Sequence, residues 1–382
     1  MSLFSSFRFT KVIFTIGPST LDVDVLRRLL RSGVDICRVN MAHASHDWTY
    51  KAIKAIRTAS VAEGKEVSIL MDIKGPEIRT GYLDGYIQLE KDQQIDLTQS
   101  DEASPEAGIP AVDINYPSLI DEAKIGDVLL VDSGLMRFQV EEVLIDRLRC
   151  RVIIPGKMGS RRHINIPGKK INLPAMTEKD IADTKIGISA NVDFFALSFV
   201  REAADINQLK KFLLDNNSAA QVVAKVEDQS GIKNLKEILD VSDALMVARG
   251  DLGIEVPYEE LPIIQKQAVS DALISGKPVI MATHLLESMI ESPMPTRAEI
   301  TDVSNSVFER VDCVMLSGET SVGKYPVECV DVLNKVTQNV ERYAGGSGFN
   351  ESLPLFTTRE KLMKSAVVLA RELGGVGIVV FS

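Results

Sequence analysis

A lysine and two carboxylates have the types and spacing that phosphoryl or enolate chemistry needs. Lys225 and Glu227 lie two residues apart in the apolar run 221–227, and Asp251 ends the run 244–251. Side chains two residues apart in a strand share a face. Two carboxylates can ligate Mg²⁺, and a neighbouring lysine can stabilise an enolate or a phosphoryl group in transfer. The simpler alternatives are solvated carboxylates at strand ends and a lysine paired with an acid.

Two arginines and a glycine-flanked turn are candidate anion ligands. Arg38 and Arg79 lie near the ends of the second and third apolar runs, and a guanidinium can clamp phosphate oxygens with two parallel hydrogen bonds. A surface ion pair is the alternative for each. The turn at 250–253 (Gly-Asp-Leu-Gly) can present backbone N–H groups to a carboxylate or phosphate, although many turns share this pattern. His43 and His284 are more often loop histidines than catalysts.

The elements that must position these residues are short apolar runs alternating with amphipathic helices. Most runs are apolar on both faces, which is typical of strands buried between a barrel interior and surrounding helices. There are eight of them: 11–17, 34–43, 67–74, 192–200, 221–227, 244–251, 278–283 and 312–317. The amphipathic pattern predicts helices between them, for example at 21–31, 177–188, 205–216, 258–275 and 325–343. Thr177 and Asp180 form a capping pattern at the start of the second of these helices.

This alternation predicts an α/β fold of the (β/α)8 TIM barrel type. A doubly wound sheet is disfavoured because no glycine-rich fingerprint follows the first run. We assign residues 1–81 and 170–345 to the barrel. Residues 82–169 predict a small inserted β-barrel domain after the third strand, placed to act as a lid. Residues 346–382 predict a linker, a helix (359–373) and a strand (377–381), as the truncated start of a C-terminal αβ domain.

Composition limits the classes of protein that this chain can represent. It has 382 residues, of which 45% are hydrophobic and 25% charged, enough for a core of its own. The formal net charge of -10 argues against nucleic acid or an anionic membrane as the main partner. No apolar window of about 18 residues and no signal-peptide pattern occurs, so we expect a cytoplasmic protein. Four cysteines without a CxxC pair predict reduced thiols and no zinc site.

Long stretches of the chain resemble the pyruvate kinase family. They cover the barrel and both junctions of the inserted domain. The matching stretches are TKVIFTIGPST (10–20), MDIKGPEIRTG (71–81), INLPAMTEKD (171–180), AKVEDQSG (224–231), MVARGDLGIEVP (246–257), ATHLLESMIESPMPTRAE (282–299) and MLSGETSVGKYP (315–326). The resemblance implies a glycolytic phosphotransferase that moves the phosphoryl group of phosphoenolpyruvate to ADP. The products would be ATP and the enolate of pyruvate, which is then protonated.

The resemblance, carried over position by position, implies a set of catalytic and substrate-binding residues. Lys225 would stabilise the transferring phosphoryl group and the enolate oxygen, and Arg38 would bind the phosphate. The substrate carboxylate would contact the backbone N–H groups of Gly250 and Asp251 and the hydroxyl of Thr283.

The resemblance also implies two kinds of cation site. Glu227 and Asp251 would hold Mg²⁺ or Mn²⁺. K⁺ would draw on Asn40, Asp72 and the carbonyl of Ile73.

The implied nucleotide ligands are Asn40, His43, Arg79 and Arg162. Arg162 matches the position of a lysine that binds nucleotide phosphate in the family. The stretch 161–165 (Arg-Arg-His-Ile-Asn) stands where a lysine–glycine pair is usual. Positive charge is kept there, but a guanidinium is bulkier than an ammonium group and differently shaped.

Other departures from the family pattern concern potassium. The family's Arg-x-Asn-Phe-Ser-His has Ala42 in place of the serine, so one oxygen ligand of K⁺ is missing and we expect weaker activation by potassium. Glu77 is the residue type that accompanies potassium dependence in the family. Ala42 therefore predicts weaker potassium dependence, whereas Glu77 predicts that the dependence is kept. His284 replaces a common glutamine, and nothing in the sequence explains that change.

Alternatives to an active kinase remain open. A Mg²⁺-dependent lyase or aldolase that forms pyruvate enolate would use the same acids, but it would need no nucleotide, which Arg79 and Arg162 argue against. A catalytically impaired binding protein is suggested by Ala42 and by the short C-terminal region. Members of the family usually carry a C-terminal domain that binds effectors and helps to form a tetramer. We therefore expect no effector regulation through that domain, and a homo-oligomer remains possible.

Overall fold

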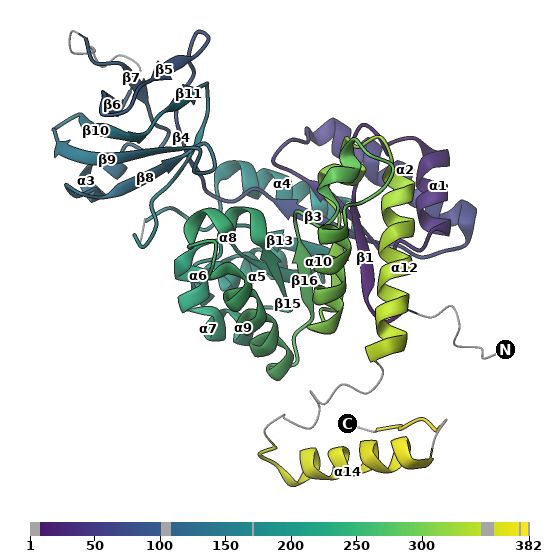
Figure 1. Cartoon of the computed structure of the whole chain (residues 1–382). Helices are drawn as coiled ribbons and strands as arrows, with labels where there is room; N and C mark the ends of the chain where they lie inside the picture. Colours follow the sequence, from purple (N-terminus) through teal and green to yellow (C-terminus); the bar gives the residue numbers. More distant parts are fainter. Residues whose placement is uncertain (1–7, 101–107, 170–171, 345–354, 374–375, 381–382) are drawn as a thin grey trace.

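The computed structural model describes residues 8–100, 108–169, 172–344, 355–373 and 376–380, and its central feature is a closed barrel (Figure 1). Eight parallel strands follow one another around it in the order β1-β17-β16-β15-β14-β13-β3-β2. They are β1 (Lys11–Thr15), β2 (Ile36–Asn40), β3 (Ser68–Ile73), β13 (Phe194–Leu197), β14 (Gln221–Val226), β15 (Ala244–Ala248), β16 (Val279–Ala282) and β17 (Cys313–Met315). Each lies within one of the predicted runs, so the predicted α/β barrel is confirmed.

Helices surround this barrel (Figure 1). They are α1 (Val23–Arg31), α2 (His46–Glu63), α4 (Glu178–Ser189), α5 (Ala203–Asp215), α6 (Gln229–Lys233), α7 (Leu235–Val241), α8 (Arg249–Glu255), α9 (Leu261–Ile274), η1 (Glu287–Ile290), α10 (Arg297–Phe308), α11 (Gly318–Ser321) and α12 (Pro326–Ala344). The predicted capping box of α4 is present, because Thr177 and Asp180 exchange side-chain to backbone hydrogen bonds of 2.8 and 3.1 Å. The glycine-flanked segment at 250–253, predicted as a turn, instead lies within α8.

The two-residue period of the strands decides which side chains enter the barrel. In β15, Leu245 and Val247 pack in the core between strands and helices, whereas Ala244 and Met246 belong to the core inside the barrel. The same alternation turns Arg38, Asp72 and Lys225 inward. Their strand neighbours all belong to the outer core: Cys37, Val39, Met71, Ile73, Ala224 and Val226. Three charged side chains are thereby directed into one end of the barrel interior.

The chain between β3 and α4 forms a separate β unit, called the lid here (blue, upper left in Figure 1). Its seven-stranded sheet has the order β4-β12-β8-β9-β10-β6-β7, and an isolated bridge between Thr80 and Ile114 joins the two edges. The lid has its own hydrophobic core. Its elements are β4 (Ile78–Arg79), β5 (Ile87–Leu89), β6 (Gln94–Thr98), β7 (Ala111–Asp113), α3 (Leu119–Glu122), β8 (Val128–Val131), β9 (Met136–Val143), β10 (Arg147–Ile154), β11 (Gly156–Met158) and β12 (His163–Asn165).

Gly75 lies where the chain leaves the barrel for the lid. Its φ of +69° favours glycine, and a Cβ there would lie 2.7 Å from the carbonyl oxygen of Ser198. We expect Gly75→Ala to lower the thermal midpoint more than Gly64→Ala does. Gly64 has a similar φ of +60° but open space around its Cβ position, so its change costs only the backbone strain of about 1 kcal/mol. Thermal unfolding followed by circular dichroism measures both, and equal shifts would contradict a close approach at Ser198.

The C-terminal region corrects one prediction. The predicted helix is present as α14 (Thr358–Leu373), but the described residues 376–380 adopt no strand, so the prediction of a strand at 377–381 is wrong there. A strand needs a hydrogen-bonded neighbour, and this segment pairs with none among the described strands. Residues 345–354, which carry most of the predicted linker, and residue 381 lie outside the described residues. Among the described helices, none is long and apolar enough to cross a membrane.

Candidate active site

A buried cluster of charged side chains occupies one end of the barrel interior. The Lys225 ammonium lies 3.2 Å from Asp72 Oδ1 and 3.1 Å from Glu227 Oε1, and it donates a 2.7 Å hydrogen bond to Ser198 Oγ. Arg38 Nε donates to Asp72 Oδ2 over 2.7 Å. Lys225 is 8% exposed and Glu227 only 1%. The structure thus joins four of the residues predicted from sequence into one network.

Burial and neighbouring charges shift the pKa values of this cluster in different directions. Burial alone would lower the pKa of Lys225, but Asp72 and Glu227 outweigh it and raise that pKa above its ordinary value. Burial alone would raise the pKa of Asp72, yet Lys225 and Arg38 hold it below its usual range. Glu227 behaves differently: burial raises its pKa to about 8 against the opposing effect of Lys225, and Asp251 adds to the rise. Lys225 and Asp72 therefore stay charged, whereas burial makes the ionised form of Glu227 costly even beside Lys225.

Asp251, Gly250 and Thr283 meet beside this cluster. Asp251 lies in the first turn of α8, and the Gly250 N–H donates a 2.8 Å hydrogen bond to Thr283 Oγ1. Thr283 has a φ of +67°, a rare conformation for a β-branched residue. Such strain persists only where the surroundings enforce it, and it clusters at functional sites. The segment after β16 is therefore held against the start of α8. The residues that the resemblance implies for the substrate carboxylate thus lie together.

Asn40 and His43, two of the predicted nucleotide ligands, line a cavity of about 430 Å³. It opens beside the ends of β1 and β2, and Pro18 and Trp48 form part of its wall. The side-chain oxygen of Asn40 accepts a 3.1 Å hydrogen bond from the backbone N–H of Ala42, which fixes the turn after β2. The indole of Trp48 gives the wall of this cavity an aromatic surface.

Arg79 and Arg162, the other two predicted nucleotide ligands, belong to the lid. Arg79 donates to both carboxylate oxygens of Glu77, over 2.7 and 3.1 Å. Burial alone would raise the pKa of Glu77, but Arg79 and Lys74 lower it to about 2. Arg162 pairs with Asp132 at 3.2 Å and is partly exposed. The four predicted nucleotide ligands therefore form two groups, one on the barrel and one on the lid.

The predicted K⁺ ligands lie on neighbouring strands. Asn40 and Asp72 are partners in the register of β2 and β3, and the Ile73 carbonyl accepts a 2.9 Å hydrogen bond from Ser198 Oγ. Among the described residues, no three His, Cys, Asp or Glu side chains gather as a metal cluster. Any cation at this end of the barrel would therefore need ligands from water or substrate as well.

Ser198 is a member of the cluster that sequence reasoning missed. Its hydroxyl contacts Lys225 and the Ile73 carbonyl, and it lies 3.3 Å from Asp72 Oδ1. The available signal was its place near the end of the predicted strand 192–200, where a polar residue follows an apolar run. Ser198 is buried and orients the lysine, so it belongs to the candidate site.

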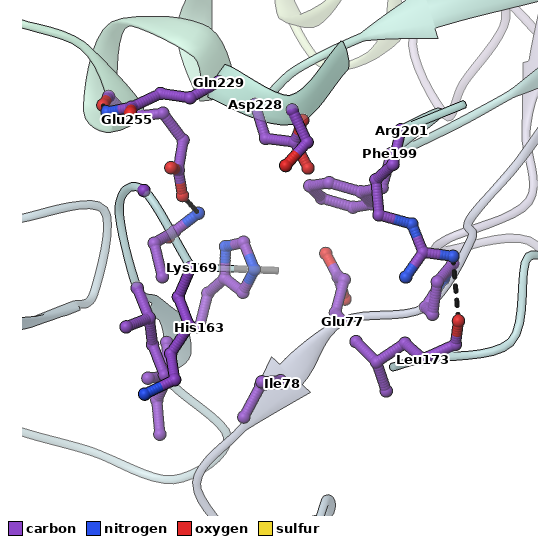
Figure 2. Close-up of a pocket in the computed structure, with 16 residues that line it drawn as sticks. Glu77, Ile78, His163, Lys169, Leu173, Phe199, Arg201, Asp228, Gln229 and Glu255 are labelled. Carbon is purple, nitrogen blue, oxygen red and sulfur yellow. Dashed lines mark hydrogen bonds between the residues drawn. The ribbon is translucent and has the colours of Figure 1, made fainter. Parts of the chain in front are cut away.

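The lid contacts the barrel across a second, smaller cavity of about 70 Å³ (Figure 2). Asn165 Nδ2 of the lid donates to Glu255 Oε1 of the barrel over 2.7 Å. The rings of His163 and Phe199 meet edge to face with their centroids 5.7 Å apart. The sequence contained no signal for these contacts, because Asn165 and Glu255 are 90 residues apart.

Glu255 adds a pH-dependent contribution to stability. Burial raises its pKa to about 7 against the opposing Asn165 hydrogen bond, and Asp228 and Asp251 add to the rise. Because its ordinary pKa is 4.5, the folded protein keeps a proton between about pH 4.5 and 7 that the unfolded chain loses. Stability therefore falls as pH rises through this window, by on the order of 3 kcal/mol at about 1.4 kcal/mol per pKa unit.

We expect Glu255→Gln to remove this loss of stability. Measured in EDTA, the thermal midpoint of the variant relative to the natural chain should increase between about pH 5 and 8 and level off at the upper end. Two midpoint curves that stay parallel across this range would show that Glu255 does not titrate there.

Comparisons with known proteins agree with this architecture. The family model described as "Pyruvate kinase, barrel domain" matches residues 7–330. The chain is 42% identical over 342 residues to a pyruvate kinase of Dictyostelium discoideum and 41% identical over 340 residues to one of Geobacillus stearothermophilus, with 88% of the chain covered in each. It spans 67% and 57% of those relatives' lengths. A crystal structure of a pyruvate kinase from Cryptosporidium parvum matches with a TM-score of 0.88 and 36% identity, covering 96% of this chain and 77% of that one.

Proposed function

The chain belongs to the pyruvate kinase family, and from that premise we propose that it transfers the phosphoryl group of phosphoenolpyruvate to ADP. The observation that carries the proposal is the buried cluster in which Lys225 contacts Asp72, Glu227 and Ser198. A lysine kept charged inside a barrel, beside a buried carboxylate whose ionised form is costly, is suited to an anionic substrate that arrives with a cation.

The reaction follows from these positions. The bond between phosphorus and the enol oxygen of phosphoenolpyruvate breaks, and a phosphate oxygen of ADP forms the new bond to phosphorus. The electron pair stays on the enol oxygen, and a proton then adds to the methylene carbon to give pyruvate. Arg38 would bind the phosphate, and Lys225 would stabilise first the phosphoryl group and then the enolate oxygen. Gly250, Asp251 and Thr283 would hold the substrate carboxylate.

A divalent cation fits this donor set. Two cations, Arg38 and Lys225, face three carboxylates, Asp72, Glu227 and Asp251. Burial raises the pKa of Glu227, and Asp251 and Asp72 add to the rise. Glu227 and Asp251 would hold Mg²⁺ or Mn²⁺, with water and substrate as the other ligands. When bound, the metal would neutralise charge on the transferring phosphoryl group.

Nucleotide and potassium would bind beside this centre. Asn40 and His43 on the barrel, together with Arg79 and Arg162 on the lid, would contact ADP. K⁺ would use Asn40, Asp72 and the Ile73 carbonyl, and a water molecule would replace the hydroxyl that Ala42 lacks. We therefore propose that potassium activates this protein more weakly than is usual in the family.

We further propose that the protein is cytoplasmic. All four cysteines are buried free thiols, which supports a reducing, cytoplasmic setting. A homo-oligomer is consistent with the family, and effector control through a C-terminal domain is not proposed for this chain.

The test is pyruvate release from phosphoenolpyruvate with Mg²⁺ and ADP, run once with K⁺ and once with a bulky organic cation. We expect turnover in both, faster with K⁺. Omitting ADP should stop the reaction; pyruvate release without ADP would mean that water accepts the phosphoryl group, which contradicts the kinase proposal. Bound phosphoenolpyruvate without turnover under any of these conditions would favour an impaired binding protein.

A further inference from the structure

The first turn of α4 contacts the loop that carries the proposed nucleotide ligands of the barrel. Lys179 Nζ donates a 2.7 Å hydrogen bond to the Met41 carbonyl oxygen, 138 residues away in the chain. Met41 is fully buried, and its own N–H donates to the Asp72 carbonyl over 2.9 Å. Met41 thus stands between Asn40 and Ala42 with both of its backbone polar groups bonded. The lysine binds this loop from outside the barrel, away from the charged cluster.

Lys179 is itself held by a buried carboxylate. Asp183, one turn further along α4, accepts hydrogen bonds from Lys179 Nζ through Oδ2 and from His46 Nε2 through Oδ1, the latter over 2.8 Å. Asp183 is 0% exposed, so its carboxylate oxygens need hydrogen-bond partners within the protein. His46 is the first residue of α2. One carboxylate therefore links α4 to both ends of the loop between β2 and α2.

Within this loop, the side chain of Met41 packs in the outer core, where its sulfur lies 3.5 Å from Thr49 Oγ1. The next residue is Ala42, which has no hydroxyl, and its N–H donates to the Asn40 amide oxygen over 3.1 Å. His43 is exposed at the edge of the cavity. Met41 therefore fixes the start of this loop to the barrel through its side chain, its N–H and its carbonyl oxygen, and Lys179 supplies the contact at the carbonyl oxygen.

We propose that Lys179, oriented by Asp183, is a positioning residue for nucleotide binding, an inference that rests on the proposed function. It does not touch substrate; it acts through the Met41 carbonyl to hold Asn40 and His43 toward ADP. Losing it should weaken ADP binding while leaving the phosphoenolpyruvate site, built on Lys225 and Arg38, in place.

The kinetic test compares Lys179→Met with Lys179→Arg. We expect the methionine variant to raise KM for ADP about tenfold, the loss that one charge-assisted hydrogen bond predicts, and to change KM for phosphoenolpyruvate less than about twofold. Arginine keeps the donor and should restore most of the affinity. Lys185→Met, an exposed lysine on the same helix, is the matched control and should behave like the natural chain. Equal increases of both KM values, or no rescue by arginine, would overturn the proposal.

A binding measurement separates this proposal from the proposed function. Trp48 is the chain's single tryptophan and lines the cavity with Asn40 and His43, so its fluorescence reports ADP directly without turnover. A response in the natural chain that shifts to about tenfold higher ADP in Lys179→Met supports the proposal. An unshifted response overturns the positioning role and leaves the kinase proposal standing. No response and no turnover in the natural chain would overturn both.

Discussion

Lys225→Met is expected to reduce turnover of phosphoenolpyruvate and ADP by about 10³-fold, the cost of removing one preorganised charge from a buried site. The ammonium of Lys225 is 8% exposed and is held by Asp72, Glu227 and Ser198, so neither water nor a flexible neighbour can replace it. Steady-state pyruvate release measures the loss. Binding of phosphoenolpyruvate, measured by calorimetry, should persist because Arg38 remains.

The matched control for this prediction is Lys236→Met, which removes an exposed lysine from α7. Its turnover should equal that of the natural chain. If Lys225→Met turns over near the natural rate, Lys225 has no catalytic role. If the variant loses the binding of phosphoenolpyruvate together with turnover, Lys225 contributes to substrate binding and not specifically to stabilisation of the transition state.

Glu227→Gln is the second substitution with a large expected effect. It removes one of two proposed carboxylate ligands, so we expect Mn²⁺ to bind at least about a hundredfold more weakly and turnover to fall by a similar factor. Glu227 is 1% exposed and its pKa is raised to about 8, so its ionised form is costly in the folded protein near neutral pH. The metal-free variant should therefore have a higher thermal midpoint than the natural chain.

In Glu227→Gln, a higher metal-free thermal midpoint together with weaker Mn²⁺ binding would identify Glu227 as a metal ligand and not only as a structural ion-pair partner. Calorimetric titration with Mn²⁺ and thermal unfolding in EDTA measure the two quantities. Glu287→Gln is the control, because Glu287 is an exposed acid that also follows a barrel strand. A Glu227→Gln variant that binds Mn²⁺ normally but has a lower midpoint would show that Glu227 only pairs with Lys225.

The barrel could be predicted from sequence because its strands are buried on both faces. The sequences of β14 and β15 are almost continuously apolar, and the only charged residue in β14 is Lys225, which faces the interior. The strand expected at 377–381 failed for the converse reason: an apolar run forms a strand only beside a partner. The segment 250–253 was misjudged because glycines suggest a turn, whereas α8 begins there.

The contacts within the candidate site could be predicted only in part. Arg38, Lys225 and Glu227 were predicted from their places at strand ends, where a barrel gathers polar residues, and Asp72 was predicted from the family resemblance. Ser198 and the Asn165–Glu255 contact were missed because closing the barrel and seating the lid decide them, and neither leaves a local pattern. The pairing of Arg79 with Glu77 likewise depends on how the chain turns into the lid.

The most direct test of phosphoryl transfer is a ³¹P NMR time course with phosphoenolpyruvate, ADP, Mg²⁺ and K⁺. We predict that the phosphoenolpyruvate signal falls while the γ-phosphate signal of ATP rises by an equal amount, and that Lys225→Met leaves both unchanged. Loss of phosphoenolpyruvate with inorganic phosphate as the product, or no loss with substrate bound, would contradict the account.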